Sequence, residues 1–240
     1  MKGQTLLLLR SLLFTALFYL WSVFFALAII PLLVCPHAWM VRSLVIWSRG
    51  INLLLALCCG IKVEVRGHEY IPTGPALVAP KHQSMLDVFA QFGVLPSLLF
   101  VMKQELMWVP LFGWYGAKMG AIIVDRSAQS VALKKMVTEA KLRFRENRQL
   151  VIFPEGTRGI PGQPPSYKPG IAALYRELQL PVHPVATNSG MHWPIRSMLR
   201  KPGTIIFEYL EPIPPGLKRG EFMRLLEERI ETASAKLAAP

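Results

Sequence analysis

A histidine and an aspartate five residues apart are the pair in this sequence with the clearest chemical meaning. They lie in the stretch Ala79-Pro-Lys-His-Gln-Ser-Met-Leu-Asp87, where a short apolar run ends at Pro80 and a helix-like run follows. In a strand-to-helix turn, this spacing lets the Asp87 carboxylate contact one ring nitrogen of His82, which fixes the tautomer and raises the basicity of the other nitrogen. The pair would then be a general base. No serine nucleophile elbow accompanies it, so the attacking hydroxyl would belong to the substrate. The alternative is a histidine that caps a helix, with the aspartate in its first turn.

The elements that must position this pair are short apolar runs that alternate with helical patterns. Strands are predicted over residues 61–66 (an edge strand), 76–79, 98–102, 120–124, 149–153, 182–186 and 204–209. Helices are predicted from residue 127 to about 147, over 171–178 and over 221–236. This alternation predicts an α/β fold with a mostly parallel sheet flanked by helices.

Candidate polar side chains follow several of these strands. Ligands of parallel α/β sheets bind beyond the carboxyl ends of the strands, so we expect these side chains to converge on one edge of the sheet. They are His82, Lys103, Arg126, Glu155, Gly156, Thr157 and Arg158.

The N-terminal 60 residues differ in character from the rest. Residues 11–30 are apolar and uncharged, which is long enough for a helix to cross a bilayer core, and Lys2 and Arg10 before them favour a cytoplasmic N-terminus. Residues 38–60 are also apolar but carry Arg42, Arg49 and Asn52 on one side, as in an interfacial helix. Either the pair is embedded as a hairpin from one side, or the first helix crosses and the second lies on the surface. We expect an anchor over residues 1–60 and a catalytic domain over 61–240.

The composition and net charge of the chain limit the classes of partner that it is expected to bind. The chain has 240 residues, 52% of them hydrophobic, and a formal net charge of +12. A basic surface joined to an apolar N-terminus favours anionic lipids or phosphorylated, CoA-like ligands. Nucleic acid is disfavoured because no zinc spacing or RNA-binding signature is present. The three cysteines, Cys35, Cys58 and Cys59, fit free thiols better than disulfides or a metal site.

Four blocks of the sequence, in order and spacing, resemble those of the glycerolipid acyltransferases, and look most like the bacterial 1-acyl-sn-glycerol-3-phosphate acyltransferases. The blocks are His82-x-x-x-x-Asp87, Gly120-Ala-Ile-Ile-Val-Asp-Arg126, Phe153-Pro-Glu-Gly-Thr-Arg158 and Leu180-Pro-Val-His-Pro-Val185. The resemblance covers about residues 62–209. The family often has asparagine before the histidine, where this chain has Lys81.

The resemblance implies a membrane-bound enzyme that moves a fatty acyl group from acyl-CoA or acyl carrier protein to the sn-2 hydroxyl of 1-acyl-glycerol-3-phosphate (lysophosphatidate), giving phosphatidate in phospholipid biosynthesis. His82 would be the general base and Asp87 would orient it. No acyl-enzyme, metal or cofactor is implied. The expected location is the cytoplasmic side of a bacterial inner membrane, among membrane phospholipids.

The same resemblance assigns the acceptor phosphate to permanent cations, because arginine binds phosphate through two parallel hydrogen bonds and lysine acts as a point charge. Arg158, Arg126 and Lys103 are the candidates in that order, and Lys168 is a weaker one. For each of them the alternative is an ordinary surface ion pair or a solvated side chain.

The rest of the third block receives supporting roles. We expect Glu155 to orient Arg158 or a glycerol hydroxyl, Gly156 to let the backbone approach the ligand, and Thr157 to donate to phosphate. Backbone N–H groups at the start of the Asp87 helix are candidate donors to the oxyanion. His183, in the fourth block, is expected to be a packed residue with a hydrogen-bond partner.

Three alternatives to a lysophosphatidate acyltransferase stay open at this stage. The first is acylation of another lysolipid, such as a lyso-ornithine lipid or a different lysophospholipid. The second is a membrane-bound lipid hydrolase, in which His82 would activate water. The third is a lipid-binding scaffold without catalysis, which would have no need for an oriented base.

Overall fold

The computed structural model describes residues 2–125 and 129–239 of the chain. Its strands are β1 (Ile61–Arg66), β2 (Ala76–Pro80), β3 (Leu98–Lys103), β4 (Ile122–Val124), β5 (Gln149–Val151), β6 (Val182–Thr187) and β7 (Gly203–Tyr209). Its α-helices are α1 (Lys2–Ala28), α2 (His37–Leu54), α3 (Leu86–Ala90), α4 (Phe112–Lys118), α5 (Gln129–Phe144), α6 (Pro169–Leu178), α7 (Ser189–His192) and α8 (Arg219–Ala238).

The strands form one seven-stranded sheet in the order β1-β7-β6-β2-β5-β3-β4. The strands β6, β2, β5, β3 and β4 pair in parallel, whereas β7 is antiparallel to β6 and parallel to β1. The mostly parallel α/β fold predicted from the sequence is therefore confirmed, and β1 is an edge strand as expected. Because five strands share one direction, the segments that follow them gather at one edge of the sheet.

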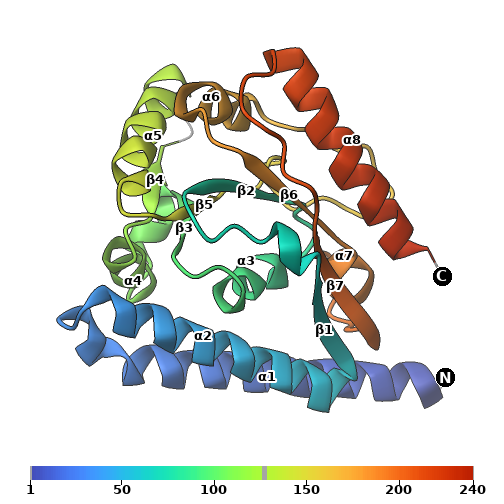
Figure 1. The fold of residues 1–240 in the computed structure, drawn as a ribbon. Coiled ribbons are helices and arrows are strands. Elements are labelled where there is room, and N and C mark those ends of the chain that lie inside the picture. The colour runs from blue at the N-terminus through green and yellow to red at the C-terminus, as the bar shows by residue number, and fades with distance from the viewer. Residues whose placement is uncertain (1, 126–128, 240) are drawn as a thin grey trace.

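Helices cover both faces of the sheet (Figure 1): α5, α6 and α8 lie on one side, and α3 with α1 and α2 beyond it lies on the other. One side of α5 packs against the sheet, because Val137 and Ala140 are buried there and Leu133 and Phe144 contact the same cluster. Every residue of β2 is buried, as expected for a strand covered on both faces.

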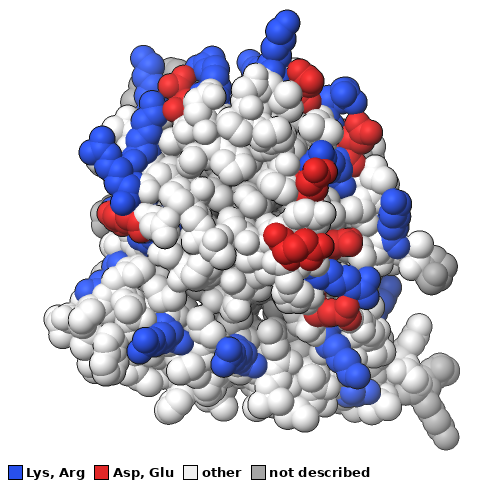
Figure 2. All heavy atoms as spheres, viewed as in Figure 1, with Lys and Arg blue, Asp and Glu red and all other residues white. Residues whose placement is uncertain are grey.

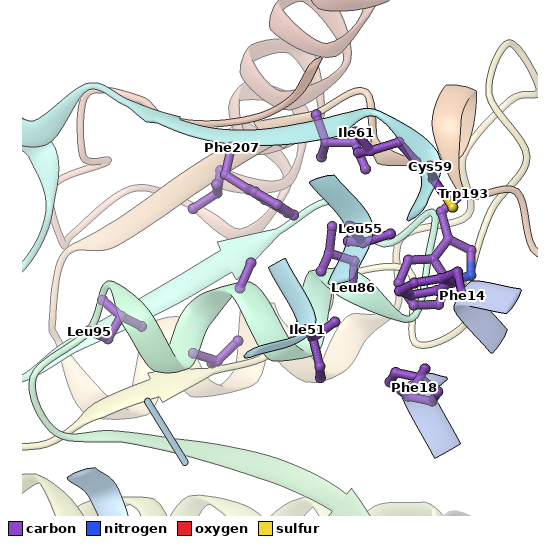
Figure 3. Close-up of a cluster of buried hydrophobic side chains, with 14 of the residues drawn as sticks. Phe14, Phe18, Ile51, Leu55, Cys59, Ile61, Leu86, Leu95, Trp193 and Phe207 are labelled. Carbon is purple, nitrogen blue, oxygen red and sulfur yellow. The ribbon is translucent and has the colours of Figure 1, made fainter. Parts of the chain in front are cut away.

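The two N-terminal helices are packed into the core of the α/β domain. Phe14 of α1 lies against Trp193 with ring centroids 5.2 Å apart, and Ile51 and Leu55 of the second helical segment are fully buried near Leu86 of α3 (Figure 3). Polar contacts add to this packing along the helices. Residues 1–60 and 61–240 thus share one buried cluster. The division into an anchor and a catalytic domain therefore refers to their expected functions and not to two separate hydrophobic cores.

The second N-terminal helix ends in a way that sets the start of the sheet. Residues Leu55–Cys59 continue α2 as a short π-helix, and Gly60 closes it with φ +66°, donating its N–H to Ala56 O. A left-handed backbone is readily adopted by glycine, so the chain turns here and enters β1 at Ile61.

Candidate active site

Asp87 fixes the orientation of the His82 ring. The Asp87 side chain is fully buried, and its Oδ2 lies 3.0 Å from His82 Nδ1. The same oxygen accepts hydrogen bonds from the backbone N–H groups of Gln83 (2.6 Å) and Ser84 (2.7 Å). With Nδ1 engaged, Nε2 is the ring nitrogen left to contact a ligand.

The other carboxylate oxygen is held by serines. Ser189 Oγ, from the segment that follows β6, donates to Asp87 Oδ1 at 2.5 Å, and Ser84 Oγ donates to it at 3.3 Å. Sequence reasoning missed Ser189, which is 102 residues from its partner. The available signal was its place after a predicted parallel strand, which is the position shared by the other site residues.

The His82 ring is also fixed by stacking. The Phe153 ring, which directly follows the β5 strand region, lies 4.0 Å from the His82 ring centroid at an interplanar angle of 21°. Phe100 of β3 stacks in turn on Phe153 at 6.4 Å. A base whose ring is packed on one side and hydrogen-bonded at Nδ1 has few alternative orientations.

The loop that carries the third sequence block forms hydrogen bonds with both the backbone N–H and the backbone C=O of His82. Glu155 Oε1 accepts the N–H of His82 at 3.0 Å, and the N–H of Gly159 donates to His82 O at 2.7 Å. We expected Glu155 to orient Arg158 or a glycerol hydroxyl, but its described contact is with His82. Glu155 is 5% exposed, and a buried acceptor needs a hydrogen-bond donor within the protein. The N–H of His82 is that donor, so the carboxylate has no need to reach the exposed Arg158.

Burial raises the pKa of the Glu155 carboxyl above its usual range, because desolvation disfavours the charged form. The hydrogen bond from His82 N and the positive charge of Lys81 act in the opposite direction and lower the pKa, while Glu231 raises it further. The loop also depends on its glycines. Gly156 has φ +66°, and a Cβ on Gly159 would lie 2.6 Å from Glu155 Oε2.

The expected phosphate ligands meet at a cavity beside His82. Lys103, Thr157 and Arg158 line it together with Gly156 and Lys168, and the His82 ring is part of the same wall. Arg158 and Lys103 are exposed and make no ion pair or side-chain hydrogen bond within the described part of the chain. Their charges are thus available to an anionic group. Arg126, the second candidate, lies outside the described residues.

Four backbone N–H groups near the start of α3, where we expected donors to the oxyanion, are used within the His82 turn. Those of Gln83 and Ser84 donate to Asp87, that of Leu86 donates to Ser84 Oγ at 3.0 Å, and that of His82 donates to Glu155. Side-chain oxygens near a helix N-terminus compete for the N–H groups of that turn. The oxyanion donors at the start of this helix stay a prediction.

Beyond these polar groups the cavity is apolar and large, at about 1360 Å³. It extends from His82 between the α/β domain and the N-terminal helices. Its apolar wall includes Phe25 of α1, Ile29 directly after that helix, Trp47 of α2, and Phe92, Tyr115 and Met119 of the domain. Tyr115 also ties the two parts together, because its hydroxyl donates to Ala26 O.

His183 and Lys81 are the remaining residues that the sequence singled out. His183 is buried and its Nδ1 contacts Tyr70 O at 2.7 Å, so the expected packed histidine with a partner is confirmed. Lys81 is 6% exposed, and its Nζ contacts both oxygens of Glu231 on α8 at 2.6 Å.

A profile of the protein family described as Acyltransferase matches residues 62–188, which is the part of the chain that holds the His82 turn and the loop that grips it. The chain belongs to the Acyltransferase family. This confirms the resemblance carried by the four sequence blocks.

Relatives within this acyltransferase family share one description. The chain is 39% identical over 159 residues to a 1-acyl-sn-glycerol-3-phosphate acyltransferase of Pseudomonas aeruginosa, an alignment that covers 66% of this chain and 62% of the relative. It is 32% identical over 206 residues to the 1-acyl-sn-glycerol-3-phosphate acyltransferase alpha of Bos taurus, covering 82% of this chain and 70% of the relative. The chain thus spans a little under two thirds of the length of the Pseudomonas relative.

A solved structure of similar fold is that of the 1-acyl-sn-glycerophosphate (LPA) acyltransferase, PlsC, from Thermotoga maritima. The TM-score is 0.80 at 22% sequence identity, and the match covers 97% of this chain and 98% of the other. Because this match includes nearly all of the chain, the acyltransferase fold here extends to the N-terminal helices as well as the sheet.

Proposed function

We propose that this protein transfers a fatty acyl group from an acyl thioester to the sn-2 hydroxyl of 1-acyl-glycerol-3-phosphate, giving phosphatidate. The observation that carries the proposal is that His82, oriented by Asp87, lines a large, mostly apolar cavity whose polar wall includes Arg158 and Lys103. The descriptions of the family relatives support the same acceptor.

In the proposed reaction, His82 Nε2 removes the proton from the acceptor hydroxyl as its oxygen attacks the thioester carbonyl. The tetrahedral intermediate collapses with loss of the thiolate, which takes the proton back from the imidazolium. Asp87 stabilises that imidazolium and keeps Nδ1 protonated throughout. A positioned base of this kind contributes about 10²–10⁴-fold to the rate. The hydroxyl and the thioester supply every bond that changes, so no covalent acyl-enzyme is needed.

The permanent cations would hold the acceptor by its phosphomonoester. Arg158 offers two parallel donors, Lys103 a second charge, and Thr157 a hydroxyl at the same wall. Arg126 remains a candidate on the strength of the sequence block alone. The apolar remainder of the cavity would take acyl chains, and its volume exceeds the roughly 300–1,000 Å³ of ordinary small-molecule sites. Water exclusion by this wall favours acyl transfer over hydrolysis.

We further propose that the helix pair attaches the protein to one leaflet of a bilayer. Two helical segments, Gly3–Ala28 and His37–Cys59, are long and apolar enough to cross a membrane. However, α1 contacts the domain along its length, because Ser11 Oγ accepts the N–H of Arg200 and Ala26 O accepts the hydroxyl of Tyr115. A crossing α1 would carry those contacts into the bilayer core. The outward side of the pair is apolar, with Leu20, Phe24 and Trp39 each more than half exposed.

Charge is consistent with this attachment. The first 60 residues contain no acidic side chain, and Figure 2 shows a mostly uncharged surface over α1 and α2 with a few basic side chains on it. Basic side chains beside an apolar surface favour anionic lipid headgroups. We place the catalytic domain on the cytoplasmic side of a bacterial inner membrane because acyl-CoA and acyl carrier protein are soluble cytoplasmic donors.

The test is a transfer assay on the purified full chain in vesicles, with labelled acyl-CoA and a panel of lysolipids with and without a phosphomonoester. Product with lysophosphatidate, lost in His82→Ala, is the expected result. Product mainly with another lysolipid would keep the chemistry and refute the acceptor. Release of free fatty acid without any acceptor would indicate a hydrolase. If no product forms with either acyl-CoA or acyl carrier protein as donor, the proposed enzymatic activity is refuted.

A further inference from the structure

A partly buried network behind the His82 turn has no role in the reaction described above. Lys81 directly precedes His82 and is 6% exposed. Its ammonium contacts both carboxylate oxygens of Glu231 at 2.6 Å, and the Tyr167 hydroxyl donates to Glu231 Oε1 at 3.0 Å. These three side chains come from the β2–α3 turn, the loop before α6, and α8. The ion pair joins residues 150 positions apart.

Backbone hydrogen bonds connect two members, Lys81 and Tyr167, to the elements around His82. The backbone N–H of Lys81 donates to Val185 O at 2.9 Å, which fixes the residue at the end of β2. Lys168, next to Tyr167, donates its N–H to Pro154 O at 2.8 Å, beside Glu155. A movement of Glu231 would therefore displace the backbone next to His82 at two places, the β2–α3 turn and the loop that carries Glu155.

We propose that Lys81, Glu231 and Tyr167 form a positioning network that holds the His82 turn against the Glu155 loop from the C-terminal helix. The inference rests on the proposed acyltransfer, in which His82 is the base. It adds positioning residues that do not touch the substrate. A displacement of about 1 Å at such a base can cost about 100-fold in rate, so the network has a measurable effect on turnover.

The network also sets the electric field at the turn. The charged or titratable groups that face it are His82 and Asp87 from the turn and α3, Glu155 from the loop after β5, Tyr167 and Lys168 from the loop before α6, and Glu227 and Glu231 from α8. Lys81 lowers the pKa of Glu155 and Glu231 raises it. Removal of Lys81 should therefore raise the pKa of the Glu155 carboxyl, and removal of Glu231 should lower it.

The experiment compares Glu231→Gln and Lys81→Met with wild type in the full chain. We expect each to lower kcat about 10- to 100-fold with the acceptor KM changed less than threefold, because positioning is lost and substrate contacts are kept. Lys81→Arg keeps the pair and should restore most of kcat. Glu228→Gln is the matched control, because Glu228 lies on the same helix but is exposed and paired with Arg224.

The second readout is the rate of His82 carbethoxylation by diethyl pyrocarbonate at one fixed pH, followed by mass spectrometry, which needs no turnover. Lys81→Met and Glu231→Gln should each raise this rate, because a loosened turn exposes the His82 side chain, which is 14% exposed in the wild type. Glu228→Gln should leave the rate unchanged. Wild-type kcat in the first two variants, or a wild-type carbethoxylation rate in them, would overturn the network. Absence of acyl transfer by the wild type would instead refute the proposed function, and the carbethoxylation rates would still decide the network.

Discussion

Replacing Glu155 separates a residue that positions the base from one that binds the acceptor. Glu155 accepts the N–H of His82 at 3.0 Å while 5% exposed, and hydrogen bonds to a charged group contribute about 1.5–3 kcal/mol each. If that whole contribution is lost from the transition state, Glu155→Ala lowers kcat by about 10- to 150-fold, since about 1.4 kcal/mol corresponds to a factor of ten. The acceptor KM should stay within threefold of the wild-type value.

Glu155→Gln is the matched variant, because its amide oxygen can still accept the N–H of His82. A neutral hydrogen bond retains about 0.5–1.5 kcal/mol, so we expect a kcat well above that of Glu155→Ala. The glutamine should also raise the melting temperature at pH 7.5 or leave it unchanged. A carboxyl whose pKa is raised in the folded state loses stability as pH rises from the usual glutamate range through the raised pKa, and glutamine removes that loss.

The assay is steady-state acyl transfer in vesicles, with acyl-CoA and lysophosphatidate varied separately. Glu155→Ala with kcat unchanged and an acceptor KM raised more than tenfold would refute the reasoning. That result would mean that Glu155 contacts the acceptor, as the resemblance to the family implied, and that the bond to His82 N is incidental to turnover.

Three further changes test other parts of the site. Arg158→Ala should raise the acceptor KM about 10- to 100-fold and the donor KM little, whereas an equal rise in both would exclude a phosphate role. Ser189→Ala should cost about 1–3 kcal/mol of unfolding free energy but lower kcat less than tenfold, because it removes the shorter of two serine hydrogen bonds to Asp87 Oδ1 while Oδ2 keeps its contacts with His82 and two backbone N–H groups. A larger fall in kcat would show that both oxygens matter. Burial lowers the pKa of His183, so the unfolding free energy of the wild type should fall as pH drops below the usual histidine value of 6.5, and chemical denaturation at pH 7.5 and 5.5 should show a weaker dependence in His183→Gln.

Local patterns in the sequence were sufficient for the strands, for the longer helices and for the His82–Asp87 pair, but the short helices α4 and α7 were not predicted. A continuous apolar run indicated the buried strand β2, and periods of two and 3.6 residues indicated β1 and α5, because burial on one side imposes these periods on neighbouring side chains. The contact between His82 and Asp87 also spans few residues, so their spacing predicted it. The convergence of Lys103 and Arg158 on one cavity followed from their places after parallel strands.

Contacts between distant parts of the chain were not predictable in this way. Ser189 reaches Asp87 across 102 residues and Lys81 reaches Glu231 across 150, and no local period connects such pairs. The partner of Glu155 was missed for a related reason: a motif gives the residue type but leaves open whether the side chain faces the ligand or the protein backbone. The packing of α1 against the domain was likewise hidden, because an apolar helix reads the same whether lipid or protein covers it.

The cavity beside His82 has a wall built by the segment that we propose as the membrane anchor. Phe25 of α1 and Ile29 directly after it line the cavity, while Ile51 and Leu55 from the same helical pair are fully buried in the domain. Under the proposed function, membrane attachment and the choice of fatty acid would be two properties of a single segment of the chain. An unrelated anchor fused to residues 61–240 would bring the domain to the bilayer but would lack the part of the cavity wall that the N-terminal helices supply. Exchange of this helix pair between relatives should carry chain-length preference with it.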